Sequence, residues 1–590
     1  MNLSILYFRN WRFIFLPIFL SLVVLVQGVS TASTSAADSN RRVYLVGAGI
    51  ASLASAVYFI QDGHIPGDNI YIFEQSNMLG GSLDASGNPS TGYLLRGGRM
   101  FTEEAYAATF DLLAKVPSLN NPQLTLKDEF DAFNHTFQSN SKARLVDKNR
   151  NIVDATRLGL SWYDTGVLTE LMLLPESLMC NKKISDYFSK DFFESNFWKM
   201  WSTTFAFQPW HSAIEMKRYQ LRFIDEVSRL YNLGGIKRSP FNQYDSFVRP
   251  IVKWLEDQGV HIILNRKVVD FDFAPSSSNR YQKSINRVHF TDKTVSNSTT
   301  DVFTDGFVDV AEDDLVLTTL GSMVEASDNG DMDRPARLLS KKDGGAWTLW
   351  ENIASKADNE EFGRPQVFDE RIAESKWLSF TVTIHDKDKR FFKFMKNFSG
   401  NNAGTGGLVT FKDSSWLMSI ILPKQPYFIN QPDDVQVIWG YGLFVDKKGD
   451  YIDKTMAEST GRDILRELMG HLRLDPKMME NAICKPVMMP FITSQFLTRS
   501  RGDRPAVVPK IAHNFAFMGQ FTEIPHDTVF TVDYSIRSAQ IAVYSLLKLD
   551  NKVTPIHYGQ YDPKILLKAI ATLLFNYTTT VRDMPSDSDI

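Results

Sequence analysis

The stretch VYLVGAGIAS, residues 43–52, decides the fold of this chain. Its apolar start, VYLV, has the β-branched and aromatic residues typical of a strand. Two glycines and the helical pattern ASLASAVYFIQDG (51–63) follow at once, and a second strand is predicted at IYIF (70–73). Strand, glycine turn, helix and strand at this spacing predict a βαβ unit with parallel strands and a right-handed crossover.

The glycine turn predicts a binding site for a pyrophosphate. Gly47 permits the tight turn, Gly49 lets the backbone approach the phosphates, and Ser52 is small enough for close helix–strand packing. The helix that follows offers N–H groups and a positive dipole end. Glu74 closes the second strand, where an acid accepts hydrogen bonds from an adenosine ribose; the alternative is a solvated Glu at the end of a strand.

Bulk composition excludes several classes of partner and site. The 590 residues include 64 Lys and Arg and 68 Asp and Glu, a net charge of −4, so no excess of positive charge favours nucleic acid. Two cysteines are too few for a disulfide framework or a Cys-based zinc site; we expect free thiols, with one bridge as the alternative. The 10 histidines show no HExxH spacing, so no metal site is predicted.

The N-terminus resembles a secretory signal sequence. Arg9 and Arg12 precede an apolar run over residues 13–26, and small residues follow. This order is typical of a signal peptide, and an uncleaved signal anchor is the alternative. We therefore expect residues 1–37 to be a signal peptide or anchor with a flexible lead-in. The protein would be secreted or lie in the endoplasmic reticulum lumen, or be anchored to a membrane.

Further elements follow from local patterns. Helices are predicted from Thr102 to Leu113 and from Tyr534 to Leu547, with an aromatic-rich and largely helical stretch over 186–223 and a polar hairpin or loop over 274–304. The last eight residues, DMPSDSDI, are predicted to be a disordered tail. More strands are predicted at Asp314–Thr319, Trp377–His385, Trp416–Leu422 and Phe515–Gly519.

Longer motifs resemble one family, the oleate hydratases, once called myosin-cross-reactive antigens. The motifs are GAGIASLASAVYFIQDG (47–63), RGGRMF (96–101), FWKMWSTTFAFQPWHSAIEMKRY (197–219), FNQYDSFVRP (241–250) and AFMGQFTEIPHDTVFTVDYSIRSAQIAVY (516–544). The resemblance covers roughly residues 41–547. It implies a hydro-lyase that adds water across a cis double bond of a free unsaturated fatty acid, giving a product such as 10-hydroxystearate, while FAD stays bound without net redox turnover.

The resemblance also implies an architecture and a set of cofactor contacts. We expect an α/β fold with a Rossmann-like FAD-binding domain, a separate α+β substrate domain and helical elements. The FAD-binding domain would comprise 38–135, 240–325 and 510–548; substrate-binding and lid regions 136–239 and 326–509; and a C-terminal helical segment and tail 549–590. A glycine pair, Gly80-Gly81, behind Glu74 favours FAD over NAD in the family pattern. The FAD contacts carried over are Gly47, Gly49, Ala51, Ser52, Glu74, Gly81, Ser82, Gly98, Arg99, Ser322, Gly519, Gln520, Thr531 and Val532.

Hydrating an alkene needs an acid for one carbon and a base that steers water to the other. By resemblance, Tyr219 matches the family's proton-donating Tyr. The family's Glu, which steers water, is replaced by Met100, and a thioether cannot take a proton from water. Glu103 and Glu104 are candidates to substitute; the alternative is that they only suit the first turn of a helix capped by Thr102. Some family members carry Met at this position, so hydration is not excluded.

The predicted head-group site departs from the family as well. Gln243 matches a family residue at the fatty-acid head, but the other polar positions are Ile421, Pro423 and Tyr427 here. Lys424 could supply the missing cation, or be a solvated Lys, so the predicted substrate-binding residues are Gln243, Lys424 and Tyr427. The alternatives to a hydratase are an FAD-dependent oxidoreductase acting on a lipid or amine and a catalytically impaired flavin- and fatty-acid-binding homologue. Transient membrane-surface contact is also expected, because fatty acids partition into bilayers; the oligomeric state is left open.

Overall fold

A five-stranded parallel sheet is built around β1 (Val43–Val46), as the glycine motif predicts. The computed structural model describes residues 40–294, 301–357 and 359–575, so the predicted leader (1–37) and the predicted disordered tail (583–590) lie outside the described residues. Helix α1 (Ile50–Gln61) connects β1 to its parallel neighbour β2 (Ile70–Phe73), which confirms the βαβ unit. The strand order is β17-β10-β1-β2-β6, with β6 at His261–Ile263, β10 at Leu315–Thr319 and β17 at Phe515–Met518.

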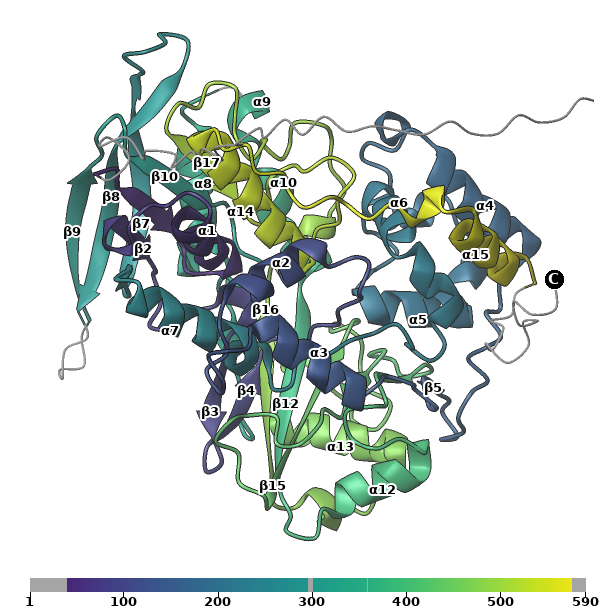
Figure 1. The fold of residues 1–590 in the computed structure, drawn as a ribbon. Coiled ribbons are helices and arrows are strands. Elements are labelled where there is room, and N and C mark those ends of the chain that lie inside the picture. The colour runs from purple at the N-terminus through teal and green to yellow at the C-terminus, as the bar shows by residue number, and fades with distance from the viewer. Residues whose placement is uncertain (1–39, 295–300, 358, 576–590) are drawn as a thin grey trace, which may run out of the picture.

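Alternate side chains of β1 face two different layers. Val43 and Leu45 are buried in the cluster that contains α1 and α14 (Val532–Leu547), which pack together (Figure 1). Tyr44 and Val46 belong to a second cluster with the antiparallel strands β7 (Arg266–Pro275), β8 (Lys283–Thr294) and β9 (Val302–Asp309) and helix α8 (Ala346–Ala354). Both faces of the parallel sheet are therefore covered, which is why its strands are almost wholly apolar. The described residues of the polar insertion, 274–294 and 301–304, contribute to this antiparallel sheet.

A seven-stranded sheet forms the second large unit. Its longest strand, β12 (Trp377–His385), has the predicted bounds and pairs antiparallel with β15 (Val435–Gly442) and β16 (Ala482–Met489). The hairpin of β3 (Ala85–Asn88) and β4 (Gly92–Leu95) packs on β12, because Tyr93 N–H donates to Thr383 Oγ1 at 2.8 Å. The remaining strands are β11 (Asp328–Asn329), β14 (Ser419–Ile421), β13 (Val409–Phe411) and β5 (Leu145–Val146).

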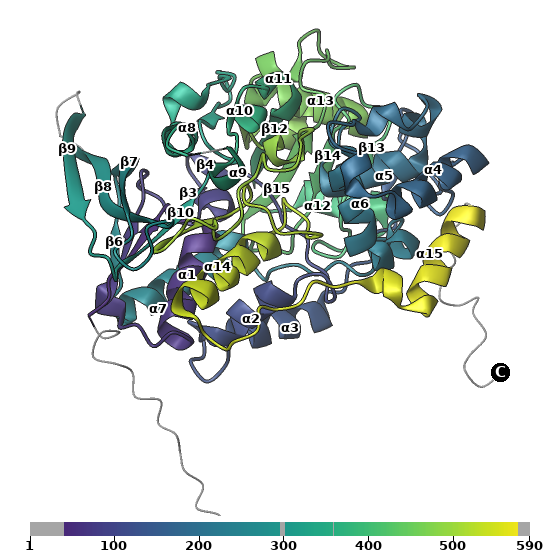
Figure 2. The same ribbon diagram turned by 90° about the horizontal axis from the view of Figure 1, so that it is seen from above.

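A helical region adjoins this sheet. The aromatic stretch over 186–223 forms α5 (Asn196–Phe205) and α6 (Ala213–Arg222), and the C-terminal segment supplies α15 (Pro563–Phe575), which packs on α4 (Trp162–Leu173) (Figure 2). The other long helices are α2 (Ala107–Lys115), α3 (Leu126–Thr136), α7 (Arg249–Asp257), α12 (Arg390–Ser399) and α13 (Gly461–Leu472). No described helix has both the length and the apolar character that a membrane span requires.

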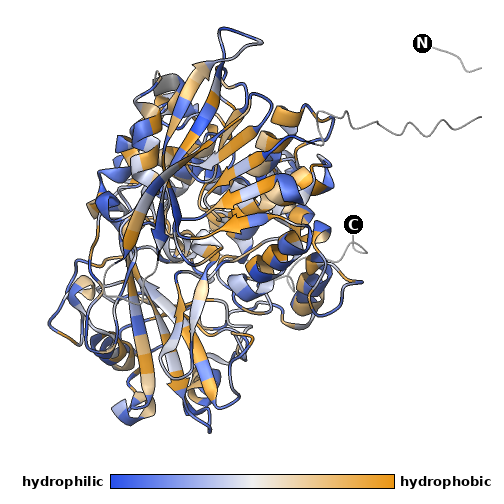
Figure 3. Cartoon of the chain, turned by 90° about the vertical axis from the view of Figure 1, so that its left-hand side faces the viewer, coloured by the Kyte–Doolittle hydropathy of each residue, from blue (hydrophilic) through white to orange (hydrophobic). Residues whose placement is uncertain are grey.

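Two predicted elements were wrong in their bounds. The helix expected from Thr102 begins at Ala107, because Phe101 N–H donates to Lys237 O at 3.1 Å and holds the preceding chain extended. The strand expected over 416–422 is confined to Ser419–Ile421. In Figure 3 the hydrophobic colour gathers on the interior strands, and the hydrophilic colour on loops and outer faces. The predicted domain boundaries stay a prediction.

Candidate active site

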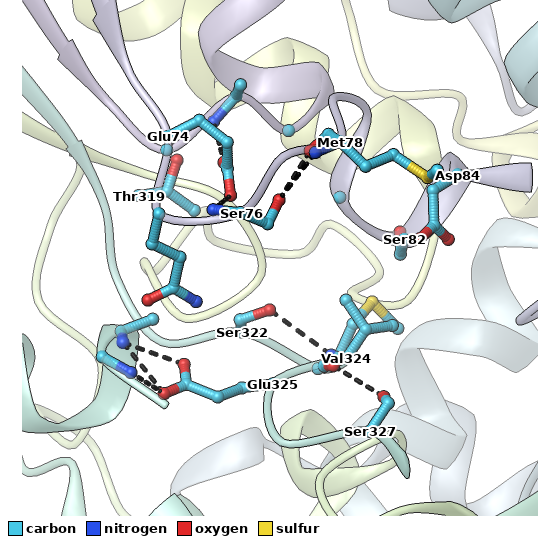
Figure 4. A pocket seen from close by; sticks show the side chains of 18 of the residues that line it. Glu74, Ser76, Met78, Ser82, Asp84, Thr319, Ser322, Val324, Glu325 and Ser327 are labelled. Carbon is cyan, nitrogen blue, oxygen red and sulfur yellow. Dashed lines mark hydrogen bonds between the residues drawn. The ribbon is translucent and has the colours of Figure 1, made fainter. Parts of the chain in front are cut away.

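A cavity of about 510 Å³ lies where the carboxyl ends of β1, β2, β10 and β17 meet, the usual ligand position in such sheets (Figure 4). Figure 4 shows Glu74 and Ser76 on one side and Ser322 and Glu325 on the other. We call this space the dinucleotide cavity. The predicted cofactor residues that line it are Gly47, Gly49, Ala51, Glu74, Gly81, Ser82, Ser322, Gly519 and Gln520.

The floor of the dinucleotide cavity is backbone. Gly47 adopts a φ of +87°, a conformation that favours glycine. Gly49 is the N-cap of α1 and no side chain caps this end, so the first N–H groups of the helix are available to an anion. A Cβ built on Gly49 would meet nothing within 4 Å, whereas one on Gly81 would lie 3.3 Å from the Gly49 Cα. A side chain at position 49 would therefore point into open space, whereas the opposite side of the Gly49 backbone is in contact with Gly81.

Glu74 is fixed at the rim of this cavity. Its Oε2 accepts from Ala48 N–H at 2.8 Å, and its Oε1 accepts from Ser76 N–H at 2.9 Å. Each carboxylate oxygen can accept a further hydrogen bond. The side chain can thus receive a ribose hydroxyl without losing the contacts that orient it.

Five of the predicted cofactor residues lie elsewhere. The Ser52 side chain is buried behind the cavity, with Oγ 3.5 Å from Thr319 Oγ1. Thr531 and Val532 form the start of α14, where Thr531 Oγ1 accepts from Tyr534 N–H at 3.1 Å and Thr531 O accepts from Gln520 Nε2 at 2.9 Å. Gly98 and Arg99 line a second pocket, described below. Thr531 therefore supports the wall residue Gln520, and neither Thr531 nor Val532 lines the cavity.

Sequence reasoning missed part of the wall. Arg266 of β7 lines the cavity, binds both oxygens of Asp292 at 2.7 Å and lies 3.8 Å over the Phe290 ring. Buried Glu325 accepts hydrogen bonds from Gly345 N–H and Ala346 N–H at the start of α8. Burial raises the pKa of Glu325 to about 7. The polar run Gln75-Ser76-Asn77 also lines the cavity, and its position directly after Glu74 was a signal that could have been used.

A second, smaller pocket of about 50 Å³ lies next to the dinucleotide cavity, and we call it the Met100 pocket. Arg96 lines both spaces and binds Asp84 at 3.0 Å, so the segment Arg96–Met100 connects them. Gly98 packs against Trp439, since a Cβ there would lie 3.4 Å from the indole ring. The remaining lining residues are Gly97, Arg99, Thr203, Thr204, Ala206, Arg238, Trp377, Leu408, Ile421, Tyr441, Ile492 and Phe530.

Tyr219 lies near this pocket without lining it. It is buried in α6, and its hydroxyl donates to Val529 O at 2.7 Å. The ring of Phe496 contacts both Tyr219, at 5.6 Å between centroids, and Phe530, at 5.2 Å. Burial, with the nearby Tyr106, Glu215 and Asp527, raises the pKa of Tyr219 well above its usual value. The phenol is therefore a protonated group at neutral pH.

The helix that carries Tyr219 is held by buried ion pairs. Glu215 binds Arg499 at 2.9 Å and Arg504 at 3.1 Å, and Arg218 binds Glu523 at 2.8 Å. Burial opposes ionisation of Glu523, but Arg499, Arg218 and Arg504 hold its pKa at about 2. This network fixes α6, and with it Tyr219, relative to the segment around residue 523.

Glu103 and Glu104 do not reach Met100. Both line a separate surface hollow, where Glu103 pairs with Lys237 and Glu104 lies 3.8 Å from Arg229. They also precede α2, so they do not occupy the first helical turn that was expected. The chain turns outward after Phe101, and the structure therefore gives these acids no position from which to replace the missing Glu.

The predicted head-group residues do not line the Met100 pocket either. Gln243 is buried and its Nε2 donates to Ser239 Oγ at 3.0 Å. Burial raises the pKa of Tyr427, against the opposing effect of Arg238, the Gln243 side chain and Arg99, which places these groups together. The Lys424 Nζ lies 5.9 Å from the centre of the Phe241 ring and away from the pocket.

Asp450, Glu467 and His471 come together in the described part of the chain. The Glu467 carboxylate already accepts from Asp450 N–H at 2.7 Å and Tyr451 N–H at 2.9 Å, which is a structural role. Cys180 and Cys484 are free thiols. The prediction of no metal site stays a prediction.

Among solved structures, the chain is similar to cyclohexylamine oxidase from Brevibacterium oxydans IH-35A. The identity is 10%, the TM-score 0.48, and the match covers 86% of this chain and 99% of the oxidase. A putrescine oxidase structure gives the same TM-score at 11% identity, with the same coverage of both chains.

Sequence relatives are far more similar. An oleate hydratase from Streptococcus pyogenes serotype M49 (strain NZ131) is 37% identical over 92% of this chain and 91% of its own length. A linoleate hydratase from Lactiplantibacillus plantarum is 32% identical over 90% of this chain and 97% of its own length. The model of the MCRA family matches residues 40–544. The chain belongs to the MCRA family, the oleate hydratase family that its motifs resemble.

Proposed function

We propose that this protein is an FAD-dependent hydratase that adds water to a cis double bond of a free unsaturated fatty acid. The observation that carries the proposal is a buried, protonated phenol, Tyr219, packed beside a pocket that adjoins a dinucleotide cavity. The proposal is also supported by the alignment of this chain, over about nine-tenths of its length, with an oleate hydratase and a linoleate hydratase.

FAD fits the residues of the dinucleotide cavity. The open space at Gly49 and the uncapped N-terminus of α1 suit a pyrophosphate, and Glu74 suits the adenosine ribose. Gly519 and Gln520, at the end of β17, would border the ring system. Bound FAD supplies a planar, polar ring that positions groups and shapes the local electric field.

Tyr219 is the proposed acid. Its hydroxyl leaves the Val529 carbonyl and gives its proton to one alkene carbon, while the oxygen of a water molecule bonds to the other carbon. The proton that this water loses restores the Tyr219 phenol, so one H and one OH are added and the enzyme is unchanged. Phe205, Phe207 and Phe496 surround the phenol, and their ring faces stabilise the positive charge that develops on carbon.

The test is turnover in heavy-oxygen water. FAD-loaded protein incubated with oleate or linoleate should give a hydroxy acid that carries the label in its hydroxyl group, detected by mass spectrometry. Tyr219→Phe should lower the rate by about 10²- to 10⁴-fold, the usual contribution of a general acid. Unlabelled hydroxy acid, or a Tyr219→Phe variant at full rate, would contradict the proposal.

Met100 favours a second candidate, a flavin- and fatty-acid-binding homologue that has lost catalysis, because the pocket offers no carboxylate to activate water. Bound oleate that is recovered unchanged, with no labelled product under any condition, would favour this candidate. The FAD-dependent oxidoreductase would instead consume an electron acceptor in proportion to product.

We also propose transient contact with a membrane surface, which would deliver the fatty acid. Trp162, Tyr163 and Leu173 of α4 and Phe575 of α15 are exposed, and Trp and Tyr suit a lipid–water interface. Co-sedimentation with phospholipid vesicles that persists in Trp162→Asp/Leu173→Asp would argue against this contact. We also propose that residues 1–37 direct the protein into the secretory pathway, which N-terminal sequencing of the mature protein would test.

A further inference from the structure

The Met100 pocket is lined by three arginines, Arg96, Arg99 and Arg238, and by no acidic side chain among the described residues. Arg96 is paired with Asp84 at 3.0 Å, outside the pocket. Arg99 and Arg238 therefore bring two positive charges into a small enclosed space.

Neither of these two guanidinium groups has an ionic partner among the described residues. Arg99 makes one hydrogen bond, from Nη2 to Ser82 O at 3.1 Å. The Arg238 guanidinium has no hydrogen bond to the described chain, and its buried Nη2 has no partner. Burial lowers the pKa of both side chains, but a guanidinium keeps its proton at any pH at which proteins fold.

A third cation lies directly behind the pocket wall. Buried Arg144 donates to Thr203 Oγ1 at 3.0 Å and Thr204 Oγ1 at 2.9 Å, and both threonines line the pocket. Burial lowers the pKa of Arg144 to about 10, so it too is charged at neutral pH. Its hydrogen bonds go to hydroxyl and carbonyl oxygens, and it has no carboxylate partner in the described chain.

An isolated buried charge is among the most unfavourable arrangements in a protein interior, because the lost hydration is not repaid. Arg238 is such a charge, whereas Arg99 has the Ser82 carbonyl and, at longer range, Asp84. A site with the Arg238 charge, a second guanidinium and an open space between its walls is therefore built to receive an anion. The space has room for a few water-sized groups, since one water needs roughly 10–15 Å³ by the same measure. A carboxylate fits this space, whereas a long acyl chain does not.

We propose that Arg238, together with Arg99, binds the carboxylate of the fatty-acid substrate in the Met100 pocket; the identity of this ligand rests on the proposed function. Ile492 and Phe530 give this pocket an apolar wall, and Phe496 and Tyr219 pack behind Phe530. Arg238 takes the role that the sequence assigned to Lys424, which does not line the pocket.

The experiment measures binding without turnover. Stearate has no double bond to hydrate, and methyl stearate has the same chain without the charge. Binding of each to the full-length, FAD-loaded protein is followed by tryptophan fluorescence, because Trp377 and Trp439 line the pocket. Stearate should bind at least about tenfold more tightly than the ester, the lower end of what a buried charge pair contributes.

Variants then assign this preference to Arg238. Arg238→Met should abolish the preference for stearate over methyl stearate. Arg238→Lys should keep part of this preference, because an ammonium supplies the charge but not the planar hydrogen-bonding geometry of a guanidinium. Lys424→Met and Arg466→Met, which remove cations outside the pocket, should keep it in full. Circular dichroism and flavin absorbance establish that each variant is folded.

Equal binding of acid and ester by the wild type would overturn the proposal, and this comparison needs no variant. A folded Arg238→Met protein that still prefers the acid would overturn it as well. If inorganic phosphate or chloride saturates the pocket while acid and ester bind alike, the site takes small anions and not the substrate. Failure of the heavy-oxygen test with the acid preference intact would remove the hydratase and leave the carboxylate site.

Discussion

The dinucleotide cavity and the Met100 pocket share Arg96 but are built on opposite principles. In the cavity each charged wall residue already has its partner: Glu74 has two backbone amides, Arg266 has Asp292, and Glu325 has the start of α8. In the pocket, neither Arg99 nor Arg238 forms an ion pair with a described residue, and the buried Nη2 of Arg238 has no hydrogen-bond partner. The cavity therefore recognises its ligand by shape and backbone dipoles, whereas the pocket recognises its ligand by charge.

Filling the open space at Gly49 should give the largest effect. Gly49 has a φ of −74°, which any residue adopts, so Gly49→Val should fold while its side chain occupies the place of the pyrophosphate. We expect FAD affinity to fall at least about 100-fold, or ~2.7 kcal/mol. The measurement is flavin fluorescence on titration of the apoprotein.

Gly166→Val is the matched control, because Gly166 is an exposed glycine of α4 whose Cβ would also meet nothing within 4 Å. It should bind FAD like the wild type. If Gly49→Val binds FAD normally, backbone approach at this turn is not what holds the cofactor.

Giving the Met100 pocket an internal acid should make it resemble the cavity. In Met100→Glu the new carboxylate would pair with Arg99 and Arg238, so the preference for stearate over methyl stearate should shrink by about tenfold, or ~1.4 kcal/mol.

Met100→Leu is the control for this substitution, since it keeps the volume and adds no charge. An undiminished acid preference in Met100→Glu would show that the arginines act at a site the new carboxylate does not reach.

A separate effect, on stability instead of binding, is expected from Glu325, whose partners are neutral amides. Its folded pKa of about 7 lies above its ordinary value of 4.5, so the folded state binds the proton more tightly than the unfolded state. Its protonation therefore favours folding below about pH 4.5, and this contribution is lost as pH rises to 7, by at most about 3 kcal/mol.

Glu325→Gln should remove this dependence. Relative to the wild type, the variant should gain stability between pH 5 and pH 8 in thermal unfolding of the apoprotein. A constant difference in melting temperature across that range would mean that Glu325 does not titrate there.

Local patterns predicted the fold where the structure depends on neighbours in sequence. The bounds of β1, β2 and β12 are predicted from apolar runs and from nearby turn residues, and the predicted bounds agree with those in the structure. The start of α2 could not be predicted this way, because it depends on the pairing of Phe101 with Lys237 across the fold.

The same difference, between local sequence and contacts across the fold, explains which site residues could be predicted. Gly47, Gly49 and Glu74 belong to one short unit, so their spacing was sufficient to place them together. Arg238 and Glu325 gain their meaning from what surrounds them in three dimensions: one lacks a counter-ion and the other caps a distant helix. The sequence shows that residue 238 is an arginine, but only the structure shows that no described acidic side chain pairs with it.

The order of strands in the parallel sheet has a consequence for synthesis. β1 pairs with β10, and β10 in turn pairs with β17, which the ribosome makes only at residues 515–518. A nascent chain thus exposes the unpaired edge of β10 during translation of about 200 further residues, and such edges promote aggregation. A premature stop before residue 515 would leave that edge permanently open and remove Gly519 and Gln520 from the cavity.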